Sequence, residues 1–301
     1  MIARSSVLAV SLSVALASPG GAAHAQTLEK VRNSRTITLG YFDFQVPLSY
    51  VDAQHKPIGY QLDICRVIVE AIRTKSGLVD VDIRYTQMTN ASAVPLLANG
   101  TVDLVCTGEP NTAERAPYAA FTNTTFLSRF AIVSRKDAPY ETIHDLKGKS
   151  IAFTTGTLAS KRITDLAFRE KLGMTLIPTR TPAEAFRLFE NRQADAYVAT
   201  ETTLASFVAR SRNGGDYMLS KKPVWIAPFA IMLRKNDPEF KQLADGVIAD
   251  LFTSGRIAEI YGKWFEAPIP PDNIVLQIPM RPELKKLLAH PIDSPRAADY
   301  D

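Results

Sequence analysis

A ten-residue phrase occurs twice in this chain of 301 residues. Residues 130–139 read Phe-Ala-Ile-Val-Ser-Arg-Lys-Asp-Ala-Pro, and residues 229–238 read Phe-Ala-Ile-Met-Leu-Arg-Lys-Asn-Asp-Pro. Each copy is a short apolar run followed by a basic pair and a proline, which is typical of a buried strand that ends at the surface. A weaker echo links residues 96–103 to 188–195. We therefore predict two similar lobes, with the chain crossing between them at each copy.

The apolar patterns on either side of the first copy follow the same order. They predict strands at 36–41, 81–85, 103–106, 150–153, 175–178 and 195–199, alternating with helices at 62–73, 91–99, 158–172, 182–192, 202–211 and 240–252. This alternation predicts an α/β fold in which each lobe is a mostly parallel sheet flanked by helices. The predicted first lobe comprises 26–136 and 228–290, the second comprises 137–227, and 291–301 form a flexible tail.

The first 25 residues have the features of a cleavable export signal. Arg4 precedes an apolar run, Val7 to Ala17, that is too short to span a bilayer, and Ala25 ends a small-x-small cleavage site. We therefore predict an exported protein, most simply periplasmic. Its formal net charge of +4 is scattered along the chain, which argues against nucleic-acid binding. We also expect a monomer.

Two cysteines, Cys65 and Cys106, have two possible fates. Export to an oxidising compartment permits a disulfide between them. Two small buried thiols would fit their apolar surroundings as well. The sequence leaves both possibilities open.

The ligand site is expected beyond the carboxyl ends of the parallel strands. This rule selects the loops near Tyr41, Thr107, Thr154 and Thr200, two from each lobe, which would line one cleft. Arg115, in the loop after the strand at 103–106, is the residue best suited to a carboxylate, because a guanidinium can donate two parallel hydrogen bonds to it. The alternative is a solvated arginine paired with Glu114 or a helix end.

Signatures of catalysis and of cofactor binding are missing. The four histidines are far apart, and there is no metal-ligand spacing, glycine-rich nucleotide loop or Gly-x-Ser-x-Gly motif. We therefore expect no metal and no cofactor. Thr157 begins a predicted helix, whose backbone amides suit an anion.

From about Thr27 to His290 the sequence resembles the type 3 periplasmic solute-binding proteins of polar amino-acid ABC importers. The motifs that carry the resemblance are Gly59-Tyr60-x-x-Asp63, Asp103 with Glu114-Arg115 and Phe121-Thr122, Asp145 to Lys149, Gly156-Thr157, and Thr253 to Gly255 with Lys263-Trp264-Phe265. Pro268 to Pro271 is similar to the glutamate/aspartate-binding branch. The resemblance implies a two-lobed Venus flytrap with two hinge strands, and an inner-membrane permease as its partner.

The resemblance also implies roles for single residues. In that family the arginine of the Glu-Arg pair binds the α-carboxylate of the ligand, a role that falls on Arg115. Gly108, Pro110 and Thr157 would lie beside the same carboxylate. The aromatic wall of the family falls on Tyr60, for which ordinary core packing is the alternative. The predicted ligand-binding set is completed by Phe42, Thr89, Thr200 and Glu201.

Several positions depart from the acidic-ligand branch. Its two side-chain arginines fall on Phe42 and Ala93, its serine on Gly108, its histidine on Pro182, and its ammonium-binding aspartate on Thr200, next to Glu201. A buried carboxylate without a cation costs roughly 3–5 kcal/mol. We therefore expect the solute to be an amino acid other than glutamate or aspartate, or a small organic acid if Glu201 does not replace the aspartate.

The leading hypothesis is therefore the solute-binding component of an importer, without enzymatic activity. One alternative is an enzyme on the same fold, similar to cyclohexadienyl dehydratases, with Glu109 or Glu201 as a general acid. Against it, Glu109 could point outward and Glu201 could cap a helix. The other alternative is a periplasmic interaction or sensory module that binds no solute.

Overall fold

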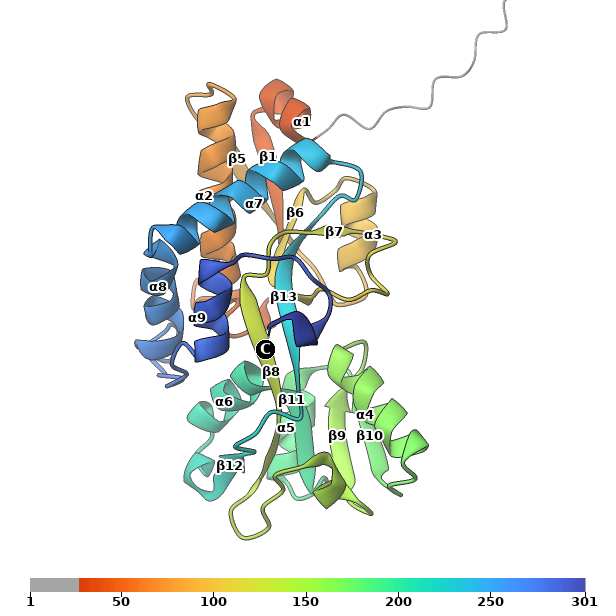
Figure 1. The fold of residues 1–301 in the computed structure, drawn as a ribbon. Helices are drawn as coiled ribbons and strands as arrows, with labels where there is room; N and C mark the ends of the chain where they lie inside the picture. Colours follow the sequence, from red (N-terminus) through yellow and green to blue (C-terminus); the bar gives the residue numbers. More distant parts are fainter. Residues whose placement is uncertain (1–26, 301) are drawn as a thin grey trace, which may run out of the picture.

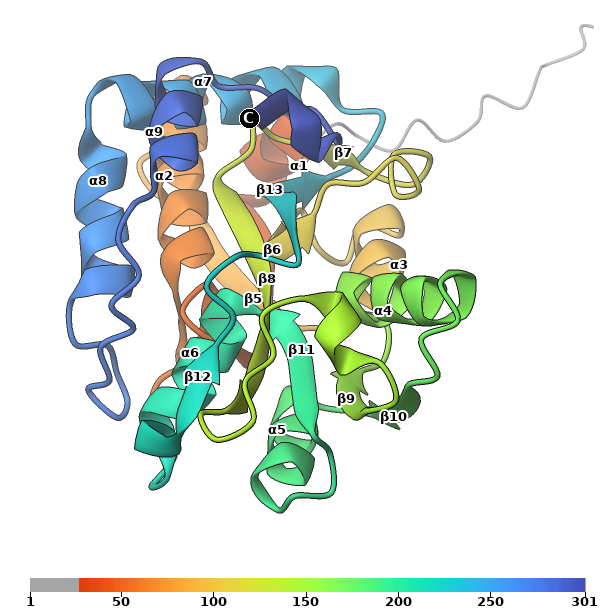
Figure 2. The ribbon, with the colours of Figure 1, turned by 60° about the horizontal axis from the view of Figure 1, so that its bottom comes forward.

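The protein has two lobes joined by long extended strands (Figure 1). The computed structural model describes residues 27–300, so the predicted export signal lies outside the described residues. Figure 2, a view from the side of the second lobe, shows that helices surround the strands of both lobes. None of the described helices has the length and apolar character needed to cross a membrane.

The first lobe is built from both ends of the described chain. Its large-sheet strands are β1 (Thr36–Tyr41), β5 (Asp82–Gln87), β6 (Leu104–Pro110), β7 (Ala120–Phe121) and part of β13 (Trp225–Leu233). A small separate sheet contains β2 (Phe44–Gln45), β3 (Ser49–Val51) and β4 (Pro57–Ile58). The helices are α1 (Thr27–Ser34), α2 (Tyr60–Lys75), α3 (Ala93–Ala98), α7 (Pro238–Thr253), α8 (Arg256–Tyr261), a π turn (Gly262–Glu266) and α9 (Pro282–Ala289).

The second lobe repeats this plan with shorter elements. Its strands are β9 (Ser150–Thr154), β10 (Thr175–Thr179), β11 (Ala196–Thr200), β12 (Tyr217–Leu219) and part of β8 (Phe126–Arg135). Its helices are α4 (Leu158–Arg169), α5 (Pro182–Glu190) and α6 (Glu201–Arg210), with 3₁₀ turns at Ile143–Leu146 and Gly214–Asp216. Thr157, Thr181 and Thr200 cap the three helices, each accepting a hydrogen bond from a backbone amide of the first turn.

The two copies of the repeated phrase lie in β8 and β13, as their predicted crossing role requires. The strand order is β10-β9-β11-β8-β13-β6-β1-β5, and β8 and β13 run antiparallel to each other at its centre. Beyond Phe130, β8 pairs with β11 of the second lobe, and beyond Phe229, β13 pairs with β6 of the first. The two-lobed α/β prediction is therefore confirmed. The lobe boundaries at 136 and 227 stay predictions; the first follows the end of β8, and the second lies within β13.

The weaker echo also has a structural basis. Asp103 and Asp195 directly precede β6 and β11, the third parallel strands of their respective lobes. The amide of Asp103 donates to the carbonyl of Thr38, whose own amide donates to the Asp103 carboxylate at 2.9 Å. Asp195 makes the same exchange with Ser150, at 2.8 Å. The hydrogen bond from the Ser150 amide is the main cause that holds the pKa of the Asp195 carboxyl below its ordinary value.

Two further features fix helix α2 within the first lobe. Cys65 on α2 and Cys106 on β6 form a disulfide, which decides between the two alternatives left open by the sequence. Asp63, from the Gly-Tyr-x-x-Asp motif, accepts hydrogen bonds from Lys263 at 2.7 Å and from the Trp264 indole at 2.8 Å. That motif and the Lys-Trp-Phe motif therefore join α2 to the C-terminal helices.

The last described residues pack against the first lobe, in contrast to the predicted flexible tail. Tyr300 is buried, and its hydroxyl lies 2.7 Å from that of Thr124. The carbonyl of Asp293 accepts a hydrogen bond from Asn111 at 2.7 Å. The described part of the tail, residues 291–300, thus lies close to the loops that connect β6 and β8.

Candidate functional site

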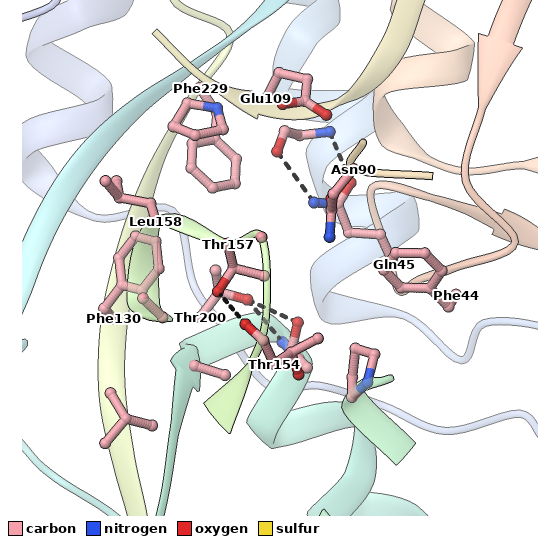
Figure 3. A pocket seen from close by; sticks show the side chains of 18 of the residues that line it. Phe44, Gln45, Asn90, Glu109, Phe130, Thr154, Thr157, Leu158, Thr200 and Phe229 are labelled. Carbon is pink, nitrogen blue, oxygen red and sulfur yellow. Dashed lines mark hydrogen bonds between the residues drawn. The ribbon is translucent and has the colours of Figure 1, made fainter. Parts of the chain in front are cut away.

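An inner cavity lies between the lobes, beside the crossing strands (Figure 3). Its volume is about 630 Å³, including the part open to solvent. The first lobe contributes β2, the end of β6 and the loop that follows, and the second contributes the ends of β9 and β11 and the starts of α4 and α5. A larger outer cavity of about 1790 Å³ adjoins it, because five residues line both: Phe44, Asn90, Thr154, Gly156 and Pro182.

Arg115 lines the inner cavity but is already engaged by a carboxylate. Its Nη1 atom donates to Oε2 of Glu109, and the Glu109 side chain is only 3% exposed. The other oxygen of Glu109 accepts a hydrogen bond from the Thr107 hydroxyl at 3.2 Å. Glu114, the partner considered from the sequence, instead accepts from Lys161 of the second lobe at 2.6 Å. A buried, charge-assisted pair thus holds the guanidinium at the cavity wall.

Gly108 and Gln45 form a second fixed unit of this wall. The Gln45 side-chain amide donates to the Gly108 carbonyl at 3.0 Å, and its oxygen accepts from the Gly108 amide at 2.7 Å (Figure 3). A Cβ atom on residue 108 would lie 2.4 Å from Leu48 Cδ1 and 2.8 Å from a ring carbon of Phe229. Only glycine fits this position, and Gln45 pairs with both of its backbone groups.

The second lobe presents hydroxyl groups and the start of a helix. Thr157 Oγ1 accepts from the Ser160 amide at 3.1 Å and donates to the Thr154 carbonyl at 2.8 Å. The Thr200 hydroxyl makes a similar cap on α6. Both threonines line the inner cavity, together with Leu158 and Ala159 from the first turn of α4. The amides of a first helical turn have no partner within the helix, so this end of α4 favours an anionic group.

Aromatic rings make up much of the remaining wall. Phe130 and Phe229, the first residues of the two copies of the repeated phrase, both line the inner cavity, with ring centroids 6.4 Å apart. Phe44 reaches the cavity from β2 and is 38% exposed. We did not predict these three rings or Gln45 as site residues. The repeated phrase could have indicated Phe130 and Phe229, because each begins one copy and lies where the chain crosses between the lobes.

Comparison with known proteins agrees with this geometry. Residues 37–267 match the family of bacterial extracellular solute-binding proteins, family 3. The chain belongs to this family. It is 35% identical over 268 residues to the L-glutamate/L-aspartate-binding protein of Pseudomonas aeruginosa, covering 89% of each chain. It is 34% identical over 287 residues to the glutamate/aspartate import solute-binding protein of Salmonella typhimurium, covering 95% of each.

A solved structure extends the comparison to the family 3 fold. The crystal structure of an ancestral amino acid-binding protein, described as a precursor of cyclohexadienyl dehydratase, aligns with a TM-score of 0.67. The alignment has 22% sequence identity and covers 80% of this chain and 99% of the other. The likeness is therefore one of fold, and it agrees with the two lobes joined by β8 and β13.

Four of the residues predicted to bind the ligand in this family 3 protein lie outside the inner cavity. Phe42 is buried in the first lobe and stacks on Phe44 with a centroid distance of 5.1 Å, and it is Phe44 that lines the cavity. Tyr60 is fully buried, and its hydroxyl donates to the Thr125 carbonyl at 2.9 Å. Tyr60 therefore has the core-packing role that was its alternative.

Thr89 and Glu201 are the other two. Thr89 lines the outer cavity, where its side chain bonds to that of Ser92. Glu201 accepts from Arg281 at 2.6 Å and lies 3.4 Å from Arg129. These groups line a separate cavity of about 370 Å³. Arg129 and Phe130 are successive residues of β8, so their side chains face opposite sides of the crossing strands.

The inner cavity therefore brings together five of the predicted residues: Gly108, Pro110, Arg115, Thr157 and Thr200. Among the side chains that the structure describes, no cluster of histidine, cysteine, aspartate or glutamate could hold a metal ion. The chemistry available in the cavity is one guanidinium, one carboxylate, several hydroxyls and a helix start. Such a set can bind and orient a small carboxylate-bearing solute.

Proposed function

We propose that this protein is the periplasmic solute-binding component of an ABC importer. It captures a small carboxylate-bearing solute, an amino acid other than glutamate or aspartate, and delivers it to an inner-membrane permease as a monomer. Family membership, the importer names of its relatives and the predicted export signal support this role. Arg115 binds the solute carboxylate, and β8 and β13 act as the hinge on which the lobes close.

The observation that carries this proposal is the charge of the inner cavity. Arg115 is the one cationic side chain among the described residues that line it, and Glu109 already neutralises that charge. The second carboxylate of glutamate or aspartate would be buried there without a cation, at a cost of roughly 3–5 kcal/mol. Arg180 lines the outer cavity and not the inner one. The solute therefore differs from those named for the two relatives above.

Solute binding is favoured over catalysis by the state of the two candidate acids. Both carboxylate oxygens of Glu109 are bound within the protein, by Arg115 and by the Thr107 hydroxyl, whereas a general acid needs an oxygen within hydrogen-bond reach of the substrate. Glu201 lies on the other side of the crossing strands, bound to Arg281. Turnover of prephenate or arogenate by the purified protein would contradict this argument and favour the enzyme.

A thermal-shift screen over amino acids and organic acids tests the proposal. A true solute at 100 times its dissociation constant stabilises the protein by roughly 2.7 kcal/mol. We expect stabilisation by one or more uncharged-side-chain amino acids and none by glutamate or aspartate. Tight binding of glutamate would overturn the solute class. A screen without any stabilising compound would favour an interaction or sensory module.

The variant Arg115→Ala tests the site by calorimetry with the compound found in the screen. We expect affinity to fall about 100-fold or more, because the deletion leaves a buried ligand carboxylate without its partner. Arg180→Ala is the matched control, since that arginine lines only the outer cavity, and it should change affinity less than about twofold. Unchanged affinity in Arg115→Ala would contradict the assigned anchor.

A further inference from the structure

We infer that Glu109 makes the inner cavity selective for zwitterions, so that a carboxylate-bearing solute must also carry a cation close to its carboxylate. This inference rests on the proposed function, in which Arg115 binds the solute carboxylate. It goes beyond it by naming the residue that discriminates between amino acids and simple carboxylic acids.

Contacts on both carboxylate oxygens fix the position of Glu109. Oε2 accepts from Arg115, and Oε1 accepts from the Thr107 hydroxyl at 3.2 Å. The backbone of Glu109 is held in the sheet opposite Ala230 of β13. Because the side chain is only 3% exposed, the carboxylate cannot turn into bulk water without breaking these contacts. A solute therefore meets Arg115 and Glu109 as one unit.

That unit changes what a carboxylate gains by binding. Alone, a half-buried guanidinium attracts any anion, but a solute carboxylate placed against Arg115 also lies within a few ångströms of the Glu109 carboxylate. Repulsion between like charges at such a separation lowers affinity about tenfold or more when water is largely excluded. An ammonium group next to the solute carboxylate is attracted to Glu109 and offsets this repulsion.

No other described carboxylate lines the inner cavity. Position 200, at the end of β11, is a threonine, and the neighbouring Glu201 faces Arg129 and Arg281 on the far side of the crossing strands. The charge that attracts a cation is therefore on the first lobe, in the same wall as Arg115. Both charges of a zwitterion can bind to the first lobe, whereas the second lobe adds hydroxyls and the start of α4.

The aromatic walls narrow the class further. Phe44, Phe130 and Phe229 suit alkyl or aromatic groups, and the faces of such rings also attract ammonium and methylated ammonium groups. The solute class is thus a compact zwitterion without a charged side group, either an α-amino acid or a betaine. Primary and methylated ammonium groups are attracted to these rings in the same way, and the test below distinguishes between them.

The test compares matched pairs of probes by calorimetry. Each pair is an α-amino acid and the acid that lacks its amino group: L-alanine with propanoate, L-leucine with 4-methylpentanoate, and L-phenylalanine with 3-phenylpropanoate. Glycine betaine shows whether a methylated cation is accepted. For the pair that binds, we expect the wild-type protein to favour the zwitterion about tenfold or more. In Glu109→Gln the ratio of zwitterion affinity to anion affinity should fall below about threefold, because the affinity for the zwitterion decreases and the affinity for the anion increases.

Two further variants complete the design. Glu109→Asp keeps the charge and should keep the preference for the zwitterion. Glu201→Gln removes a carboxylate outside the cavity and should leave the ratio unchanged. An unchanged ratio in Glu109→Gln, or a wild-type protein that binds both members of a pair equally, overturns the inference and leaves the proposed function standing. If Glu109→Gln does not fold, a wild-type protein that binds both members of a pair equally still overturns the inference. Failure of every probe to bind overturns both.

Discussion

Two glutamates near the crossing strands, Glu109 and Glu201, are each paired with arginine, and their surroundings differ. Glu109 and Arg115 come from β6 and the loop after it, both in the first lobe, so their contact does not depend on how the lobes are placed. Glu201 begins α6 of the second lobe, whereas Arg281 precedes α9, which packs on α7 of the first. This second pair must stretch or break when the lobes separate.

We infer that the two pairs have separate tasks. A pair inside one lobe fixes the charge that a solute encounters, in the open and in the closed protein. A pair between lobes favours one arrangement of the lobes and contributes nothing to the cavity wall. Burial and the nearby Arg281 hold the pKa of Arg129 below its ordinary value. Two arginines thus lie close together beside Glu201.

The largest expected difference between the two pairs is in folding stability. Glu109→Ala leaves Arg115, whose side chain is 24% exposed, without its partner, and we expect the free energy of unfolding to fall by about 3 kcal/mol. Glu201→Ala should cost about 1 kcal/mol, because Arg281 is 35% exposed and can be hydrated instead, and Arg129 keeps the favourable charge of Glu283 nearby. Urea denaturation of both variants without ligand measures the contrast. Equal losses would mean that burial does not distinguish the pairs.

A smaller effect is expected on lobe closure. Glu201→Gln weakens the contact between α6 and the segment before α9, so the closed form should be less populated and solute affinity should fall about threefold to fivefold. Small-angle scattering should show a larger radius of gyration without ligand, and calorimetry gives the affinity. Glu70→Gln is the control, because its partner Arg73 is on the same helix. A variant with unchanged closure would assign Glu201 a purely local role.

Much of the frame could be predicted from the chain alone. The repeated phrase indicated the crossing strands because a strand buried on both sides has a recognisable apolar run that ends in charges. The echo before Asp103 and Asp195 marked equivalent turns, since each aspartate bonds to the start of the neighbouring strand. Arg115 could be singled out because the carboxyl end of a parallel strand predicts where a loop faces a cleft.

The side on which a residue lies was harder to predict. Phe42 and Phe44 are two positions apart, and the chain after β1 is turned by a hydrogen bond from the Phe42 amide to the Ser49 hydroxyl, which no local pattern indicates. Glu201 is drawn away from the cavity by Arg281, 80 residues later in the chain. Tyr300 packs against Thr124 across 176 residues. Contacts of such long range depend on the whole fold and have no signature within a short window of sequence.

The smallest expected effect concerns the exposed pair that also spans the cleft, Lys161 and Glu114. The hydrogen bond from Lys161 holds the pKa of Glu114 below its ordinary value of 4.5. Because the lowered pKa belongs to the arrangement in which the lobes meet, the pair favours that arrangement above about pH 4.5, and this contribution is lost as the pH falls through the lowered pKa. Their side chains are 53% and 66% exposed, so Lys161→Ala should weaken solute binding less than about twofold at pH 7.

High salt should remove the small difference in solute affinity between the wild type and Lys161→Ala, because salt strongly screens exposed charges. Calorimetry of the wild type and Lys161→Ala at pH 7, in low and in high salt, measures this difference in affinity. A further titration at a pH below the lowered pKa of Glu114 should give the two proteins equal affinities. The same salt series on Glu201→Gln should retain most of its effect, since Arg129 is only 15% exposed. A loss of more than fivefold in Lys161→Ala would contradict this prediction. It would mean that solvent exposure does not determine how much an ion pair between the lobes contributes, and that closure depends on Lys161 and Glu114 as much as on Glu201 and its two arginines.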